Sequence, residues 1–190
     1  MKAIVKFFVW AAFACWPLYS GAAVEMTVVT PSGVVAFTVE EQWQVLSMQP
    51  TLPIAAAVFQ LPNQADEGTA DSTNLILQLY DLKSPEALQA LQKVGQVFGA
   101  AKPKEEVFKG WVLYRQDSVQ DGTAYSVIDA KQRLKTVAAS VRLAWPHLKN
   151  NPAAYDAQMV EALHKVLLSV QERVGPWRPE SGAVIRRPEQ

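Results

Sequence analysis

Residues 137–146, which read VAASVRLAWP, carry the clearest strand pattern in the chain. Apolar residues stand at every second position, and a period of two places them on one face of a strand. These alternating positions are Val137, Ala139, Val141, Leu143 and Trp145. Pro146 closes the strand, because proline has no N–H to donate to a neighbouring strand. The segment predicts a sheet with one strongly apolar face.

The residues before this strand predict a meander. Asp121-Gly122 has the residue types of a two-residue hairpin turn, and we expect strands on either side, at 106–119 and 123–128. Both faces of residues 106–119 are apolar, which favours a central strand covered on both sides. Residues 130–135 carry charges without apolar alternation, and we expect a turn there.

Further strands are expected nearer the N-terminus. Residues 24–39 fit two strands around the turn Thr30-Pro31-Ser32-Gly33, in which proline and glycine suit the turn backbone. Apolar runs predict two more strands, at residues 54–61 and 74–81. Residues 40–48 fit either a strand or a short helix.

Two helices complete the pattern. Ser84-Pro85 and Asn151-Pro152 each combine an N-cap residue with proline at the first helical position. Apolar residues recur at helical spacing after both starts, as far as Gly99 in the first case and residue 170 in the second. The sequence therefore predicts an α+β fold, a twisted antiparallel sheet of about six strands with two main helices packed on it.

The first 23 residues have the features of a cleavable signal peptide. Lys2 and Lys6 precede an unbroken apolar run at 7–15, and small residues fill positions 20–23, just before the expected cut. The apolar run is too short to span a bilayer. We expect cleavage after residue 22 or 23 and a single mature domain at 24–174 in the periplasm of a Gram-negative type of cell.

Cys15, the one cysteine of the chain, supports an alternative. A lipoprotein signal places a cysteine directly after a short apolar run, and lipidation would anchor the protein to a membrane. Ala12 stands where that signal usually has leucine, and Phe13 is bulky, so simple cleavage is favoured. The mature chain would then have no disulfide, thiol nucleophile or cysteine-bound metal.

The charge of the chain argues against nucleic acid as a partner. The chain has 18 basic and 18 acidic residues, and loss of Lys2 and Lys6 would leave a net charge of about −2. Nucleic-acid binding needs a basic face, and the only basic run is Arg186-Arg187. It lies in the Pro- and Arg-rich residues 175–190, which predict a disordered tail. No run after residue 23 is long and apolar enough to cross a membrane.

No motif indicates catalysis, a metal or a cofactor, and we expect no cofactor. The glycine patterns of nucleotide loops and the Gly-x-Ser-x-Gly pattern of serine hydrolases are absent. His147 and His164 are the only histidines, too few for a zinc site. The acidic loop at 62–72 lacks the spacing of a calcium-binding loop.

Six residues are candidate contacts for a protein partner. Exposed tryptophans often mark contact surfaces, and the acidic loop at 62–72 could insert into a partner. The candidates are Trp43, Asp66, Glu67, Asp71, His147 and Trp177. Trp111 and Trp145 lie in expected strands and are predicted to be in the core.

Four stretches carry a family resemblance. They are STNLIL at 72–77, the helix start at 84–86, DGTAY at 121–125 and the final helix at 151–170. In this order the chain resembles the PsbP-like and DcrB-like group of small exported α+β proteins. The resemblance implies an antiparallel sheet between helices and a role in binding, assembly or chaperone-like work. It supplies no catalytic residue.

The sequence therefore favours a non-catalytic periplasmic binding or assembly module with a protein partner. An immunity protein that neutralises a toxin acting in the periplasm is the alternative. An enzyme with an unrecognised site is the third hypothesis.

Overall fold

The computed structural model describes residues 22–30, 33–62, 72–94, 104–149, 151 and 153–175. Several predictions fall outside these residues, namely most of the signal peptide with Cys15, the loop acids Asp66, Glu67 and Asp71, and the tail with Trp177. The elements in chain order are β1 (Ala23–Thr30), β2 (Gly33–Glu40), β3 (Gln44–Gln49), β4 (Ile54–Leu61), β5 (Thr73–Asp81), α1 (Pro85–Lys93), β6 (Lys104–Phe108), β7 (Trp111–Gln120), β8 (Thr123–Arg133), β9 (Val137–Pro146), α2 (Tyr155–Ser169) and β10 (Gln171–Val174).

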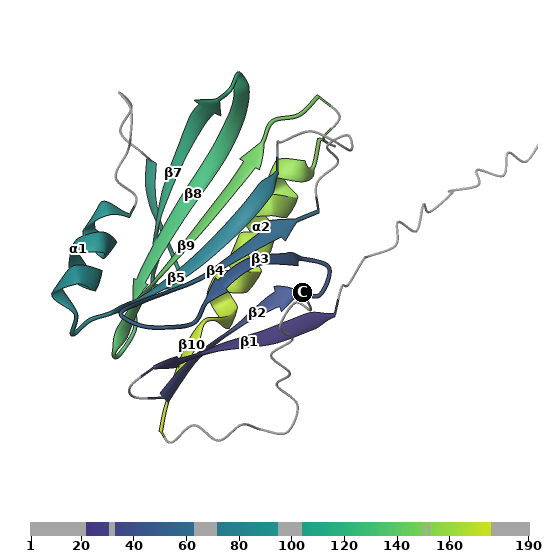
Figure 1. The fold of residues 1–190 in the computed structure, drawn as a ribbon. Coiled ribbons are helices and arrows are strands. Elements are labelled where there is room, and N and C mark those ends of the chain that lie inside the picture. The colour runs from purple at the N-terminus through teal and green to yellow at the C-terminus, as the bar shows by residue number, and fades with distance from the viewer. Residues whose placement is uncertain are drawn as a thin grey trace, which may run out of the picture.

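The described strands form two antiparallel sheets (Figure 1). The large sheet has seven strands in the order β3-β4-β5-β9-β8-β7-β6, and the small sheet has three in the order β1-β2-β10. The prediction of an α+β fold with one sheet of about six strands and two main helices packed on it is therefore wrong. The described protein is mostly β, and its second sheet shares the core with the first.

Pairing between β5 and β9 sets the two faces of the large sheet. The inner face carries three buried cross-strand pairs, Leu75 with Leu143, Leu77 with Val141, and Leu79 with Ala139. Helix α2 and the small sheet pack on this face in one core. Between the sheets, Phe37 of β2 meets Phe59 of β4 edge to face, with ring centroids 6.2 Å apart.

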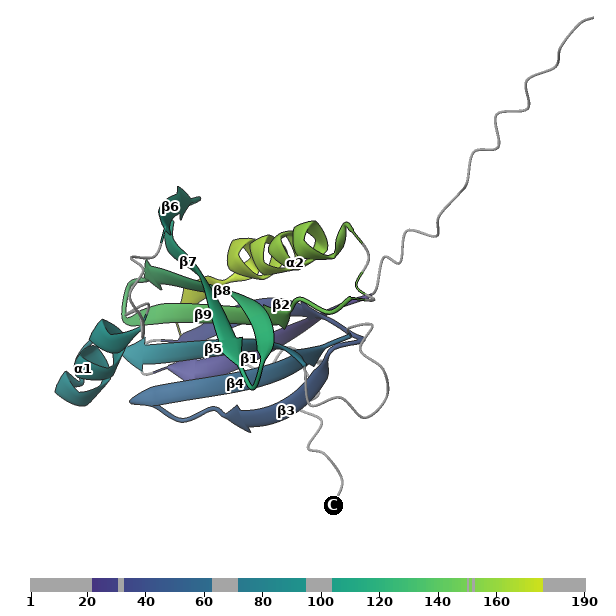
Figure 2. The ribbon, with the colours of Figure 1, turned by 90° about the horizontal axis from the view of Figure 1, so that it is seen from above.

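Helix α1 lies on the opposite, outer face, where it covers only one end of the large sheet (Figure 2). Ala87 packs there against Tyr80 and Ala138. The predicted start of this helix is confirmed, because the Ala87 N–H donates to the Ser84 hydroxyl at 3.2 Å. The helix ends at Lys93, and the predicted stop at Gly99 lies outside the described residues.

The single long strand predicted at 106–119 is wrong, because the chain turns back at Lys109-Gly110. Both turn residues have positive φ, 48° and 89°, as in the tight turns that join hairpin strands. The turn shifts the alternation by one residue, so that Phe108 pairs with Trp111 on the inner face. Val107 points away from the core and is exposed.

The turn predicted at 130–135 is also wrong, because β8 continues through Arg133. Lys131 and Arg133 pair in register with Ser140 and Ala138 of β9, so backbone pairing extends the strand. Asp129 lies opposite Arg142 of β9 and accepts hydrogen bonds of 2.8 and 3.0 Å from that guanidinium. A charged stretch can therefore continue a strand where the neighbouring strand offers its backbone for pairing.

The two strands predicted at 24–39 are confirmed as β1 and β2, and the strands at 54–61 and 74–81 as β4 and β5. The ambiguous residues 40–48 hold the edge strand β3. Strand β10 was not predicted. It joins β2, and its Glu172 accepts hydrogen bonds from the backbone N–H groups of Lys135 and Thr136 in the turn between β8 and β9. Glu172 thereby links the two sheets.

The last helix begins at Tyr155, later than the predicted Asn151-Pro152 start. Its N-cap, Ala154, makes no side-chain cap hydrogen bond. The Asn151 side chain instead donates to the Pro146 carbonyl at 2.9 Å and holds the loop after β9. The predicted apolar stripe is confirmed, since Tyr155, Met159, Leu163 and Val166 are buried.

Gly33 provides a test of β10 docking. A Cβ at position 33 would lie 2.0 Å from the Arg173 carbonyl oxygen, and φ there is +151°. We expect Gly33→Ala to lower the free energy of unfolding by about 3 kcal/mol, through overpacking and backbone strain. Hydrogen exchange should show lost protection at residues 171–174.

Gly122→Ala is the matched control, because Gly122 also has positive φ, +84°, but has no atom near its Cβ position. We expect a loss of about 1 kcal/mol from strain alone, with β10 protection retained. Equal effects of the two substitutions would contradict the proposed close packing of β10 on Gly33.

Candidate functional site

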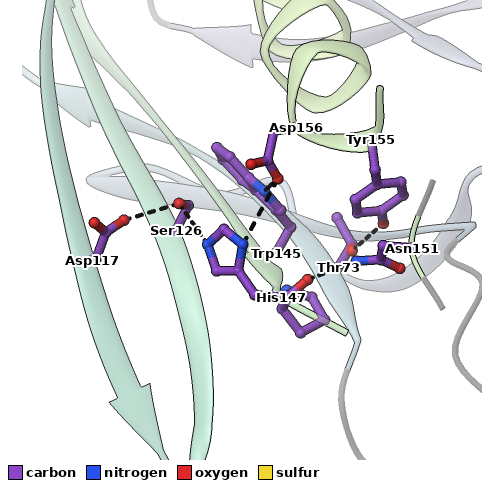
Figure 3. Close-up of polar contacts among 9 residues, drawn as sticks. Thr73, Asp117, Ser126, Trp145, His147, Asn151, Tyr155 and Asp156 are labelled. Atoms are coloured by element: carbon purple, nitrogen blue, oxygen red, sulfur yellow. Dashed lines mark hydrogen bonds and ion pairs between the residues drawn. The ribbon is translucent and has the colours of Figure 1, made fainter. Parts of the chain in front are cut away.

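A chain of polar side chains joins β7, β8 and the residue after β9 (Figure 3). The Ser126 hydroxyl donates to Asp117 Oδ1 at 2.9 Å, and Ser126 Oγ lies 2.9 Å from His147 Nε2. Register brings these groups together, because Asp117 lies opposite Ser126 across β7 and β8. The His147 N–H also donates to the Ala124 carbonyl at 2.8 Å, which extends pairing beyond the end of β9.

The chain continues into the first turn of α2. Asp156 Oδ1 accepts a hydrogen bond from Trp145 Nε1 at 2.8 Å and lies 3.9 Å from His147 Nδ1. A carboxylate in this turn is also favoured by the helix dipole. The serine, histidine and aspartate thus stand in the order of a hydrolase triad, although the outer distance exceeds a hydrogen bond.

The positions of the hydrogens distinguish this row of polar side chains from a working catalytic triad. The Ser126 hydroxyl has one hydrogen, and the Asp117 carboxylate can only accept it. Ser126 Oγ must therefore accept from His147, so Nε2 carries a hydrogen. A catalytic base needs the reverse arrangement, with Nε2 unprotonated and facing the hydroxyl hydrogen. Ser126 is also only 2% exposed, too buried to meet a substrate.

A groove adjoins this chain between α2 and β7. It is open to solvent, has a volume of about 390 Å³ and is lined by Arg115, Asp156, Ala157, Val160, Glu161 and His164. Asp156 thus belongs to both the polar chain and the groove. The Arg115 guanidinium carbon lies 6.0 Å from the centre of the buried Trp145 ring, at the limit of a cation–π contact.

Charges of opposite sign line the two walls of the groove. Arg115 comes from the strand wall, and Lys104 of β6 lies directly opposite it in register, so both side chains lie on the inner face. Asp156 and Glu161 come from the helix wall. Among the described residues, Arg115 forms no ion pair with either acid. The groove therefore holds its opposite charges apart.

His164 closes the end of the groove nearest β6. Its ring stacks on Phe108 with centroids 3.8 Å apart and planes 7° from parallel. Its Nε2 is buried and has no hydrogen-bond partner in the described structure. The residue is half-buried and lies next to the buried Leu163 of the apolar stripe. Stacking with Phe108 joins the β6–β7 hairpin to the helix.

The start of α2 is held by a further buried contact. Tyr155 and Thr73 share a hydrogen bond of 2.7 Å between their hydroxyls. Burial raises the pKa of the Tyr155 phenol, and the Thr73 hydrogen bond partly opposes that rise. The phenol therefore stays neutral at physiological pH and anchors the helix beside β5.

A second polar group lies on the outer face of the large sheet. Asp129 is 2% exposed and pairs with Arg142, and the Lys131 ammonium lies 5.2 Å from the centre of the Tyr114 ring. Burial lowers the pKa of Lys131, with the Asp129 charge opposing that change. Asp129 and Arg142 neutralise each other, and we assign the group a structural role.

Of the predicted contact residues, only Trp43 and His147 lie in the described part of the chain. Trp43 is 7% exposed and packs in the core, so it offers no surface to a partner. His147 is partly exposed and lies in the polar chain. Trp111 and Trp145 are buried as predicted. In the described part of the chain, no three His, Cys, Asp or Glu side chains cluster as a metal site, and no helix has the length and hydropathy to span a bilayer.

Sequence reasoning missed Asp117, Ser126, Asp156 and Arg115. Each stands alone in the sequence among ordinary strand and helix residues. One signal was present, since Arg115 and Asp117 occupy the inward positions of a strand whose other inward residues are apolar. A charge at an inward position indicates that the strand extends beyond the core or lines a site.

Comparisons with known proteins give no family. No protein-family model matches the chain, and no curated protein matches it. The resemblance to the PsbP-like and DcrB-like group therefore remains a prediction.

Two solved structures are distantly similar. One, from Bacteroides thetaiotaomicron, is 11% identical with a TM-score of 0.44; the match covers 73% of this chain and 45% of that one. The other is LpqN of Mycobacterium tuberculosis, described as involved in cell envelope biogenesis. It is 14% identical with a TM-score of 0.41, over 76% of this chain and 87% of that one. The match spans less than half of the Bacteroides chain, and neither TM-score supports a functional argument.

The hydrogen placement in the polar chain can be tested by NMR. At an alkaline pH that leaves histidine rings neutral, we expect long-range ¹H–¹⁵N spectra to place the His147 proton on Nε2. Asp117→Asn should shift the ring towards the Nδ1-protonated form, because the Ser126 hydroxyl is then free to turn to Nε2.

Asp121→Asn is the matched control, since Asp121 is exposed in the hairpin turn, where asparagine also tolerates positive φ. Its tautomer should equal that of the unaltered protein. A proton on Nδ1 in the unaltered protein would contradict the assignment and restore the catalytic arrangement.

Proposed function

We propose that the mature chain is a non-catalytic binding module that works in the periplasm. It holds a protein or peptide partner in the groove between α2 and β7. The compartment is supported by the leader, in which Lys2 and Lys6 precede a short apolar run. Cleavage after Ala22 would leave β1 complete, because that strand begins at Ala23. Lipidation of Cys15 would place the same module on a membrane.

The closed polar chain supports a non-catalytic role. The Ser126 hydroxyl is directed at Asp117, and its oxygen accepts from His147. A nucleophile needs a free approach for its substrate and a base that can take its proton. The same contacts are well suited to fixing the start of α2 against β8 and β9, since Asp156 receives the Trp145 N–H.

The groove carries the proposal of binding. Arg115 lies at its strand wall without a carboxylate partner among the described residues, while Asp156 and Glu161 line the helix wall. All three charged side chains are exposed, so a ligand can reach each of them. With Ala157 and Val160 between the two acids, the groove offers charges of both signs beside an apolar surface, which suits a ligand with polar ends.

The compartment is tested by the mature N-terminus. We expect the full chain, made in a Gram-negative host, to be recovered from the periplasm with Ala23 or Val24 as its first residue. Mass spectrometry of the intact protein measures this directly. A lipid-modified N-terminus at Cys15 would move the protein to the membrane, and an intact chain beginning at Met1 in the cytoplasm would overturn the proposal.

The binding role is tested by blocking the groove. Ala157 is exposed and lines the groove, so Ala157→Arg adds bulk there without disturbing the core. We expect a protein or peptide to co-purify with the unaltered chain from the periplasm of its own cell, and to be reduced at least about tenfold by this substitution. Quantitative mass spectrometry of protein and low-mass components provides the measurement.

Gln158→Arg is the matched control, because Gln158 is exposed on α2 next to Ala157 but does not line the groove. It adds the same charge and should retain the bound component. Equal recovery with Ala157→Arg, or no bound component with any form, would count against the groove as a binding site.

A further inference from the structure

The strand wall of the groove presents a guanidinium with its hydrogen-bonding edge uncommitted. Arg115 approaches the Trp145 ring at 6.0 Å, and its side chain forms no hydrogen bond or ion pair with the described residues. An aromatic ring can orient a guanidinium by its face while its five N–H groups stay available at the edge. Such an edge matches a carboxylate by two parallel hydrogen bonds. Lys104, across from Arg115 on β6, adds positive charge to the same wall.

The helix wall presents carboxylates with spare acceptor capacity. Asp156 uses Oδ1 for the Trp145 N–H, and Oδ2 has no hydrogen-bond partner among the described residues. Glu161 lies 3.3 Å from Lys165, but both side chains are more than 60% exposed. An exposed pair one helical turn apart is weak and easily exchanged. Both acids can therefore accept from an ammonium group.

The floor between the walls is apolar. Ala157 and Val160 lie on the helix between the two acids, and Val160 is partly buried against the core. The volume of about 390 Å³ lies in the range of small-ligand pockets. A ligand that spans the groove therefore needs one anionic end, one cationic end and a short stem between them.

We infer that the groove binds a short peptide with free ends. Its terminal carboxylate would lie on Arg115, its ammonium would lie between Asp156 and Glu161, and small side chains would contact Ala157 and Val160. This inference rests on the proposed binding function and adds the chemical class of the ligand. A simple anion would be repelled by Asp156 and Glu161, and a simple cation would be repelled by Arg115. Neither ion would therefore complement both walls.

A titration with trialanine tests the inference. We expect trialanine with free ends to give saturable ¹H–¹⁵N chemical-shift changes at groove residues of the mature chain. N-acetyl-trialanine amide, which lacks both charges, should bind at least about tenfold more weakly, because a charged hydrogen bond is lost at each end. The shifts should include Ala157, Val160 and His164, which line the groove.

Two substitutions examine the two ends separately. Arg115→Gln should weaken trialanine at least about tenfold and abolish its preference for a free carboxylate, and Glu161→Gln should weaken it several-fold. Arg133→Gln and Glu41→Gln are the matched controls, because both residues are exposed and neither lines the groove. The controls should bind trialanine as the unaltered chain does.

A blocked peptide with glutamate and lysine side chains distinguishes free ends from an internal segment of a partner. Stronger binding of the blocked peptide than of trialanine would overturn the inference, as would equal binding of trialanine and its blocked form. If neither peptide binds while Ala157→Arg still removes a co-purified component, the ligand class is wrong and the binding function stands. Trialanine binding that Arg115→Gln leaves unchanged would also overturn the assignment.

Discussion

The pairing of β5 with β9 is the interaction on which the rest of the structure depends. The two strands lie more than fifty residues apart in the chain and supply the inner row of leucine, valine and alanine side chains. Burial of that row separates an inner from an outer face, because a shift by one residue would turn every apolar side chain outwards. The inner face then receives α2 and the small sheet, and α1 is left to the outer face.

The candidate site follows from where β9 ends. Trp145 is the last inward residue of that strand, and its ring supports Arg115 while its N–H holds Asp156 at the start of α2. His147 follows directly and closes onto Ser126. The end of β9 thus positions both the polar side chains around Ser126 and the groove beside them. The side chains of Asp117, Ser126 and His147 satisfy one another and stiffen the helix start. The groove beside them presents charges of both signs, and among the described residues Arg115 there forms no ion pair. Internal satisfaction favours a structural role, and unpaired charge in a concave site favours binding.

The errors in the predicted fold have separate physical causes. Residues 130–135 read as a turn because they are charged, yet their backbone pairs with β9 as far as Arg133. The hairpin at Lys109-Gly110 was missed because apolar residues continue on both sides of it. Strand β10 is four residues long and has no apolar pattern; it exists because β2 has a free edge and Gly33 lets it approach. For β10, a strand distant in the chain supplied the pairing that the local sequence pattern did not indicate.

The sequence by itself determined the strands with clean alternation, the hairpin at Asp121-Gly122, the capped start of α1 and the apolar stripe of α2. These features depend on neighbours within a few residues, and their periodicity is visible without any knowledge of the fold. Only the tertiary structure decided that the strands divide into two sheets, that Trp43 is core, and that Arg115, Asp156 and His164 line one groove. Those outcomes depend on which strand edges and side chains meet across long stretches of chain, and isolated charged residues carry no local signal of the partners they will face.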